Sequence, residues 1–454
     1  MAFLDDSYLI TSDAGRRIYD AIRDLPVIDM HNHADVAEIA ADAPYRNLWQ
    51  LLGATDHYVW ELMRKCGVPE ERITGTASER EKFDALAAAM PRMVGNPIYE
   101  WLHLDLRRCF GIEETLSAAT AATIWNQGLE ALADPGCRPQ ALLKKLNIEV
   151  FCSTDDPADT LEHHDTVNQA FGRTVVRPTW RPDKAMNIDA PGWIEYIRKL
   201  GERWGLRIAT CADLFEALRL SHGFFHDHGC RASDHGVEYP PCRAGRDEAE
   251  QLFRRACDGE TLTRREADAF RGRFLYETAK MDADADWVFQ LHAGAVRNVR
   301  RNLMDNLGPD SGGDILSLHQ DFLPGLLELL NHFDDRLKVV LYTLDPAQQP
   351  TLATVSRAFG SRVRLGAAWW FNDTPYGIRS QLEYIASVDL LDAFAGMVSD
   401  SRKITSYGSR FELFRRVLAD VLGAFAERGQ APEELLTQTA CRICVENPRA
   451  FFRI

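Results

Sequence analysis

Residues 27–33 read VIDMHNH, a short apolar run followed directly by two histidines that one residue separates. Apolar runs of this length, rich in β-branched residues, are typical of buried strands. Similar runs recur along the chain between longer stretches whose apolar residues have helical spacing. The eight runs are Val27–Met30, Ile148–Ser153, Thr174–Pro178, Cys230–Ser233, Trp287–His292, Lys338–Thr343, Val363–Ala368 and Ala395–Asp400. Their alternation with helices predicts a parallel sheet covered by helices.

The number of strands favours one barrel over several domains. Eight alternating strands and helices match a (β/α)8 barrel, and such barrels with insertions reach the length of this 454-residue chain. We predict one α/β domain over residues 1–454, a TIM-like (β/α)8 barrel with large helical insertions. These insertions span 34–145, after strand 1, and 236–284, before strand 5. Because the fourth run is weakly marked, an open doubly wound sheet is the alternative.

The composition excludes several classes of protein. Lys and Arg number 52 and Asp and Glu 67, and the resulting formal charge of −15 argues against a general nucleic-acid binder. No apolar run is long enough to cross a membrane, and the first residues lack the order of a signal peptide. The ten dispersed cysteines, including Cys441 and Cys444, fit reduced thiols better than disulfides or a zinc site. We therefore expect a cytoplasmic protein with no nucleic-acid or membrane partner.

Potential metal ligands follow three of the predicted strands. His31 and His33 come directly after the first strand, and alternate residues of an extended segment point the same way. His292 ends the fifth strand and Asp400 ends the eighth. In a barrel these strand ends meet at one face, so we expect a mononuclear site of nitrogen and oxygen ligands. Such ligands suit zinc, manganese or iron.

Longer stretches of the sequence resemble one known family. The histidines after strands 1 and 5 and the aspartate after strand 8 look like the amidohydrolase superfamily, and nine stretches narrow the resemblance to its uronate isomerases. They are DHYVWELMR at 56–64, EKF at 81–83, GNPIYEWLHLDLRRCFGI at 95–112, STDDP at 153–157, RPDKAMNI at 181–188, GCRASDHG at 229–236, QLHAGAVRN at 290–298, GAAWWFND at 366–373 and VSDSRKITSY at 398–407. Where the family usually reads HCHL, residues 31–34 read HNHA, which keeps both histidines.

The resemblance implies a distorted (β/α)8 barrel of the amidohydrolase type with one divalent metal ion, zinc first and manganese or iron as alternatives. It implies isomerisation of the uronate sugars D-glucuronate and D-galacturonate to D-fructuronate and D-tagaturonate. It makes His31, His33 and Asp400 metal ligands, with His292 as a fourth ligand or a substrate contact. Because family members are often oligomeric, it also implies a homo-oligomer.

An aldose–ketose isomerase moves a proton from C2 to C1, so it needs a base and a group that relays a proton between O1 and O2. We expect Asp400 to take part as the base. His57 and Tyr58 are the candidates for the relay, because each can donate and accept a proton. The alternative for this pair is a packed helix with Tyr58 buried and His57 on the surface.

The permanent carboxylate of a uronate requires cationic partners. Arg181, Arg297 and Arg402 follow strands 3, 5 and 8, and a guanidinium group matches a carboxylate bidentately. We expect these arginines to meet at the site even though the whole chain is acidic.

Three more residues complete the expected substrate site. Trp369 and Trp370 end strand 7, and we expect one to pack against the sugar and the other against the core. Asp234 follows strand 4, where it either binds a hydroxyl group or orients Arg181.

Two other functions and one other site compete with this interpretation. A metal-dependent hydrolase could use the same barrel, but such enzymes commonly add a bridging Lys or Glu and a histidine after strand 6, where KVVLYTLD has none. A non-enzymatic helical interaction protein fits the large insertions but not the polar residues at strand ends. A metal site at His222, His226, His228 and Cys230 is disfavoured, because this segment enters strand 4 from its amino-terminal side.

Overall fold

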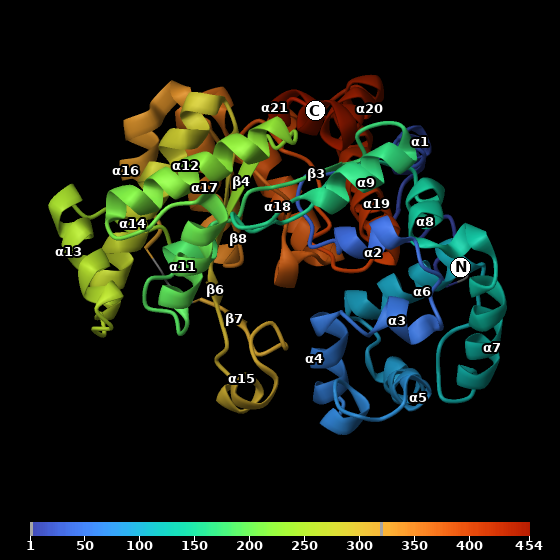
Figure 1. Ribbon diagram of the computed structural model, residues 1–454. Helices are drawn as coiled ribbons and strands as arrows, with labels where there is room; N and C mark the ends of the chain where they lie inside the picture. Colours follow the sequence, from blue (N-terminus) through green and yellow to red (C-terminus); the bar gives the residue numbers. More distant parts are fainter. Residues whose placement is uncertain (1–2, 318–320) are drawn as a thin grey trace.

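The computed structural model describes residues 3–317 and 321–454 and shows an α/β fold with two parallel sheets (Figure 1). The first sheet has the order β1 (Val27–Asp29), β2 (Ile148–Cys152), β3 (Val176–Arg177). The second has the order β4 (Ala232–Val237), β5 (Val288–Ala293), β8 (Lys338–Thr343), β9 (Val363–Leu365). Every residue of β5 is buried, as expected for a strand covered on both faces. The predicted α/β class with parallel pairing is confirmed.

Helices fill the intervals between strands. Between β1 and β2 lie α2 (Val36–Ala41), α3 (Leu48–Leu52), α4 (His57–Lys65), α5 (Glu79–Ala89), α6 (Pro97–Phe110), α7 (Ala121–Leu132) and α8 (Pro139–Lys145). Between β2 and β5 lie α9 (Glu162–Phe171), α10 (Asp183–Met186), α11 (Trp193–Trp204), α12 (Cys211–Asp227), α13 (Arg246–Cys257) and α14 (Arg264–Ala285). The others are α1 (Asp13–Ile22), α15 (Arg301–Leu307), α16 (Leu323–Phe333), α17 (Gln349–Phe359), α18 (Pro375–Val388), α19 (Thr405–Glu427), α20 (Glu433–Cys441) and α21 (Asn447–Phe452). The segments 34–145 and 236–284 are thus largely helical, and their description as insertions into a barrel stays a prediction.

Local sequence signals determine several helix starts. Ser78, Thr210 and Thr263 cap α5, α12 and α14, each in a capping box with an acidic residue three positions later. The long helix α19 is buried over most of its length and packs against α1 and α6. Because α19 begins directly after residues 398–404, it anchors the segment that carries Asp400.

Two predicted strands differ in the structure. The fourth strand spans Ala232–Val237 rather than Cys230–Ser233, so Asp234 lies within it and not after it. No strand is formed at Ala395–Asp400. Gly396 and Asp400 adopt left-handed φ angles of +106° and +48°, which interrupt an extended ladder.

Single backbone contacts connect the Ala395–Asp400 segment to the strands on either side. Ala395 N–H donates to the carbonyl of Leu365 at 3.0 Å, and Asp400 N–H donates to the carbonyl of His31 at 3.1 Å. Trp180 forms isolated parallel bridges between the first and second sheets. Within the described residues, strand pairing therefore gives two open sheets rather than one closed barrel.

A third, two-stranded antiparallel sheet of β6 (Ala295–Val296) and β7 (Ile315–Leu316) holds α15 away from the body of the molecule (Figure 1). We call residues 295–317 the arm. Arg64 on α4 donates from Nη1 to the carbonyl of Ser311 on the arm at 2.5 Å. The arm therefore meets the helices that follow β1.

All ten cysteines carry free thiols. Cys441 ends α20, and Cys444 lies in the short π-helix that follows it (Arg442–Glu446). Across the part of the chain that the structure describes, no helix combines the length and the apolar character needed to span a bilayer.

Candidate active site

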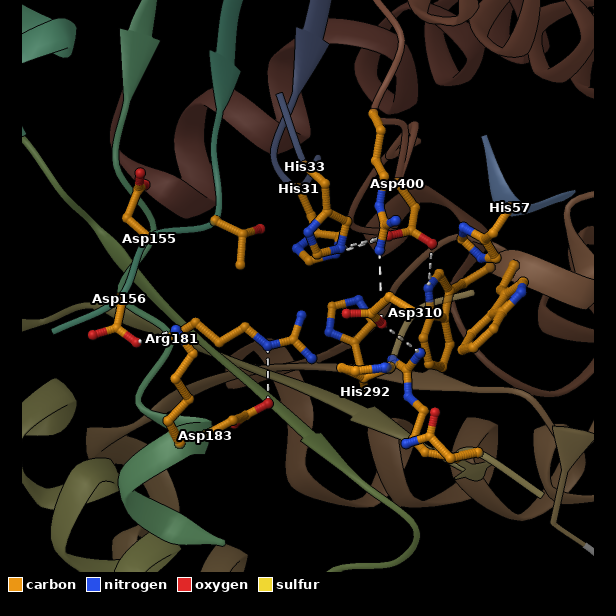
Figure 2. Close-up of a pocket in the computed structure, with 18 of the residues that line it drawn as sticks. His31, His33, His57, Asp155, Asp156, Arg181, Asp183, His292, Asp310 and Asp400 are labelled. Atoms are coloured by element: carbon orange, nitrogen blue, oxygen red, sulfur yellow. Dashed lines mark hydrogen bonds and ion pairs between the residues drawn. The ribbon is translucent and has the colours of Figure 1, made fainter. Parts of the chain in front are cut away.

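A cavity of about 530 Å³ is lined by residues that follow β1, β2, β3, β9 and the arm's first strand, and Figure 2 shows the side chains around it. Ten of the twelve predicted site residues line it. They are His31, His33, His57, Arg181, His292, Arg297, Trp369, Trp370, Asp400 and Arg402. The other two, Tyr58 and Asp234, lie behind these side chains and contact them.

His31, His33 and Asp400 meet at one point of this cavity (Figure 2). The Nε2 atoms of His31 and His33 each lie 3.2 Å from Asp400 Oδ1. Burial alone would raise the pKa of the Asp400 carboxyl, but hydrogen bonds from both histidines hold it well below its usual range. Asp400 is therefore a carboxylate with one oxygen directed at two imidazoles.

Buried contacts to the preceding residue, Ser399, position Asp400. Asp29 at the end of β1 accepts hydrogen bonds from the Ser399 N–H, at 2.9 Å, and from its hydroxyl. Arg410 on α19 donates from Nη1 to the Ser399 carbonyl at 2.9 Å. Asp400 has a left-handed backbone that few non-glycine residues adopt, so surrounding contacts must maintain it. The Ser399 contacts supply that support.

The second carboxylate oxygen of Asp400 has different partners. Trp369 Nε1 donates to Oδ2 at 2.9 Å, and the Tyr58 hydroxyl donates to the same oxygen at 3.3 Å. The carboxylate is therefore fixed in rotation, with Oδ1 toward the histidines and Oδ2 toward the two aromatic side chains.

The donor set fits a divalent metal ion. Tetrahedral ligands at 2.0–2.1 Å from zinc lie about 3.3 Å apart, close to the nitrogen–oxygen separations around Asp400 Oδ1. A second group of potential ligands, His31, Asp234 and His292, adjoins the first. His31 Nδ1 and His292 Nε2 are buried and lack hydrogen-bond partners, whereas the buried Asp234 Oδ2 lies in an ion pair with Arg181. Both groups contain His31, and only the first has all of its members on the cavity wall.

Asp234 connects His292 to Arg181. Its Oδ1 lies 2.7 Å from His292 Nδ1, and its Oδ2 lies 3.0 Å from Arg181 Nη1. Arg181 also pairs with Asp183 at 2.9 Å. Burial lowers the pKa of His292 to about 4, although Asp234 opposes this shift. His292 is thus neutral at pH 7, with Nε2 left free for a further contact.

Arg297 and Arg402 line the same cavity as Arg181. The Arg297 guanidinium packs over the Trp370 ring at 4.5 Å and pairs with Asp314 at 2.9 Å. Arg402 lies 3.7 Å from Asp310, which belongs to the arm. All three predicted arginines therefore reach the same cavity, where Arg297 and Arg402 share Asp310 as a partner and Arg181 pairs with Asp183 and Asp234.

His57 and Tyr58 begin α4 and lie beside Asp400. Their rings stack at a centroid distance of 4.5 Å, and His57 lines the cavity. Burial and the charge of Arg402 lower the pKa of His57 to about 4, so the ring is neutral at pH 7. Tyr58 is buried, and Arg410 packs over its ring at 4.9 Å.

Comparison with known proteins agrees with this geometry. A sequence model of glucuronate isomerase matches residues 1–452. A uronate isomerase from Thermotoga maritima is 46% identical over 451 residues, which is 99% of each chain. The chain belongs to the glucuronate isomerase family. The crystal structure of a uronate isomerase from Thermotoga maritima superposes with a TM-score of 0.97 at 46% identity and full coverage of both chains. That of a glucuronate isomerase from Caulobacter crescentus gives 0.94 at 27% identity, covering 100% of this chain and 97% of the other.

Membership of the glucuronate isomerase family confirms the resemblance found in the sequence and supports the isomerase over the hydrolase interpretation. It also excludes the non-enzymatic helical interaction protein, because the enzyme family's model matches residues 1–452, including the helices that follow β1.

Sequence reasoning missed several residues of this glucuronate isomerase family site. Asp183 and Asp310 line the cavity, whereas Asp29, Asp373 and Arg410 lie behind it. Burial, partly offset by Arg410, raises the pKa of Asp373 to about 7. Asp183 and Asp373 fall in the stretches RPDKAMNI and GAAWWFND, which were a usable signal. Asp310 and Arg410 carry no such signal, since their contacts depend on how distant segments pack.

The histidines near β4 serve the packing of this family member. His222 Nε2 lies 3.0 Å from Asp282 Oδ1, and its ring stacks on Trp287 at 3.7 Å. His228 Nδ1 lies 2.8 Å from the carbonyl of Phe224. Among the described residues, none of these side chains belongs to a cluster able to hold a metal ion.

Proposed function

We propose that this protein interconverts D-glucuronate and D-fructuronate, and D-galacturonate and D-tagaturonate, as an aldose–ketose isomerase. The observation that carries this proposal is the full-length family match combined with one cavity that holds a His–His–Asp group and three arginines. A uronate needs both features, because its reacting carbonyl end and its carboxylate end must be recognised together.

We further propose one divalent ion per chain, zinc first and manganese or iron as alternatives, held by His31, His33 and Asp400. His292 is a fourth ligand or, as its unpartnered Nε2 suggests, a substrate contact. Once bound, such an ion would supply Lewis-acid polarisation of a substrate oxygen. The backbone contacts of Ala395–Asp400 and of Trp180 support the proposal that the two sheets form a distorted (β/α)8 barrel.

The arginines would orient the substrate through two groups of contacts. We propose that Arg297 and Arg402 bind the sugar carboxylate and that Arg181, held by Asp234 and Asp183, binds other oxygens of the sugar. Asp234 is fully buried, which favours orientation of Arg181 over contact with a sugar hydroxyl.

Asp400 would act as the base that takes the proton from C2 and returns it to C1. Hydrogen bonds from Trp369 and Tyr58 to Oδ2 fix the orientation of this carboxylate. Trp369 therefore serves the carboxylate, whereas Trp370, with Arg297 packed on its ring, offers a surface to the sugar.

The relay between O1 and O2 would use His57 and Tyr58 together. His57 reaches the cavity and is neutral at pH 7, so one ring nitrogen can accept a proton while the other donates. Tyr58 lies behind it, with its hydroxyl on Asp400. We propose that His57 contacts the substrate and that Tyr58 exchanges a proton with Asp400.

Proton NMR tests this function directly. The purified protein should convert D-glucuronate to the ketose, lose this activity with a chelator and regain it with added zinc or manganese. Hydrolysis of an ester or amide without isomerisation would favour the alternative, a metal-dependent hydrolase.

We also propose that the protein is a cytoplasmic homo-oligomer. The ten free thiols support the cytoplasmic compartment, and light scattering would measure the oligomeric state.

A further inference from the structure

The loop at residues 308–313, GPDSGG, places an acidic side chain inside the proposed sugar site. The Asp310 carboxylate lies 3.8 Å from Arg297 and 3.7 Å from Arg402, and Figure 2 shows Asp310 among the side chains around the cavity. It also lines the cavity. These two arginines are the ones that we assign to the sugar carboxylate, so a carboxylate of the protein itself already faces them.

The surroundings keep Asp310 charged. Burial alone would raise the pKa of its carboxyl, but Arg402 and Arg297, together with His33 and His57, hold it below its usual value. The side chain is nevertheless 56% exposed, unlike the buried carboxylates Asp234 and Asp400. An ion pair in such an exposed position is weak and can be broken at small cost.

The loop can release Asp310 without losing its anchors. Gly308 and Gly312 have φ angles of +82° and +83° on either side of Asp310. The contacts that hold the loop do not involve Asp310. The Ser311 carbonyl accepts a hydrogen bond from Arg64, and Asp314 forms an ion pair with Arg297. The carboxylate can therefore turn away by a side-chain rotation while the arm stays in place.

We propose that Asp310 is an internal occupant of the subsite for the substrate carboxylate. This inference rests on the proposed function. Without sugar, Asp310 keeps the guanidinium groups of Arg297 and Arg402 directed into the cavity. An incoming uronate displaces it, because two carboxylates at one pair of arginines repel each other. A neutral sugar cannot make this exchange, so Asp310 also favours acidic over neutral substrates.

Asp310→Asn tests the competition. Asparagine keeps the shape of the side chain and tolerates the left-handed backbone at this position, where φ is +57°. Asp305→Asn is the matched control, because Asp305 is an exposed residue of the same arm outside the cavity and the charge change is identical. The probe is D-gluconate, an acidic sugar without an aldehyde, titrated calorimetrically into the metal-loaded protein.

We expect Asp310→Asn to bind D-gluconate about three- to tenfold more tightly than Asp305→Asn does, the size expected for exposed ion pairs. KM for D-glucuronate should fall similarly, with kcat within about twofold of the wild-type value. Equal or weaker gluconate binding in Asp310→Asn would overturn the proposal, as would a kcat reduced more than about tenfold, which indicates a part in the chemistry. If the wild-type protein does not isomerise D-glucuronate but the gluconate difference is present, the proposed function fails and the competition stands.

Discussion

Two regions of the cavity are built in different ways. We call His31, His292 and Asp400 the cavity floor. Their side chains are only 1%, 2% and 11% exposed. We call Arg402, Arg297 and Asp310 the cavity rim. Their side chains are 30%, 41% and 56% exposed. Buried partners hold the floor residues, whereas the rim residues pair mainly with one another or with the arm.

This difference indicates a division of work. Groups that move protons need fixed distances, and only buried, multiply bonded side chains keep them. Groups that admit an acidic sugar must exchange partners, which exposed ion pairs do at low cost. We therefore expect substitutions in the floor to change kcat and substitutions in the rim to change KM.

Asp400→Asn should have the largest effect. The variant loses the proposed base and weakens the metal site, so kcat should fall by about 10³–10⁴-fold or more. Kinetics with D-glucuronate and elemental analysis of the bound metal would separate the two causes. A kcat within about tenfold of the wild-type value would show that the floor does not hold the base.

Tyr58→Phe removes the hydroxyl behind the floor and preserves the ring that packs under Arg410. We expect kcat to fall by about 10²–10³-fold with little change in KM, because the proton exchange with Asp400 is lost. In D2O the variant should exchange the C2 proton faster than it forms the ketose, which proton NMR can follow. Unchanged turnover would assign Tyr58 to packing alone.

Arg402→Lys acts on the rim. Lysine keeps the charge but not the bidentate geometry, so kcat/KM should fall by about ten- to a hundredfold, mostly through KM. Arg265→Lys on α14 is the control for an exposed arginine that does not line the cavity, and it should behave like the wild type. If kcat falls and KM does not, the division between floor and rim is wrong.

The smallest expected effect is a shift in the pKa of His57 when the rim charge of Arg402 is removed. The pKa of His57 is about 4, first because of burial and second because of the Arg402 charge. The neutral ring required for the relay should therefore persist down to about pH 5 and be lost as the pH falls through 4. Arg402→Met should raise the pKa of His57 toward its ordinary value of about 6.5, because the repelling charge is gone. NMR titration of the His57 ring measures this, and an unchanged pKa would contradict the coupling.

The site could be predicted to a large extent because its ligands and arginines follow apolar strands within distinctive stretches. His31, His33 and His292 needed only their position at strand ends, since parallel strands direct their carboxyl ends to one face. Strand 4 was placed too early because its residues include Asp234 and His235, which break the apolar pattern. The strand expected at Ala395–Asp400 failed because Gly396 and Asp400 adopt left-handed φ angles, which the identity of neither residue specifies.

By itself, the sequence determined the α/β class and the family, and it predicted the candidate metal ligands and the arginines that line the cavity. These depend on periodicity and on residues close together in the chain, which local physical chemistry dictates. Only the tertiary structure decided that Arg410 and Asp29 hold Ser399, that Tyr58 lies behind His57, and that Asp310 faces Arg297 and Arg402. Such contacts join segments far apart in the chain, and they arise from packing and charge pairing that no local pattern contains.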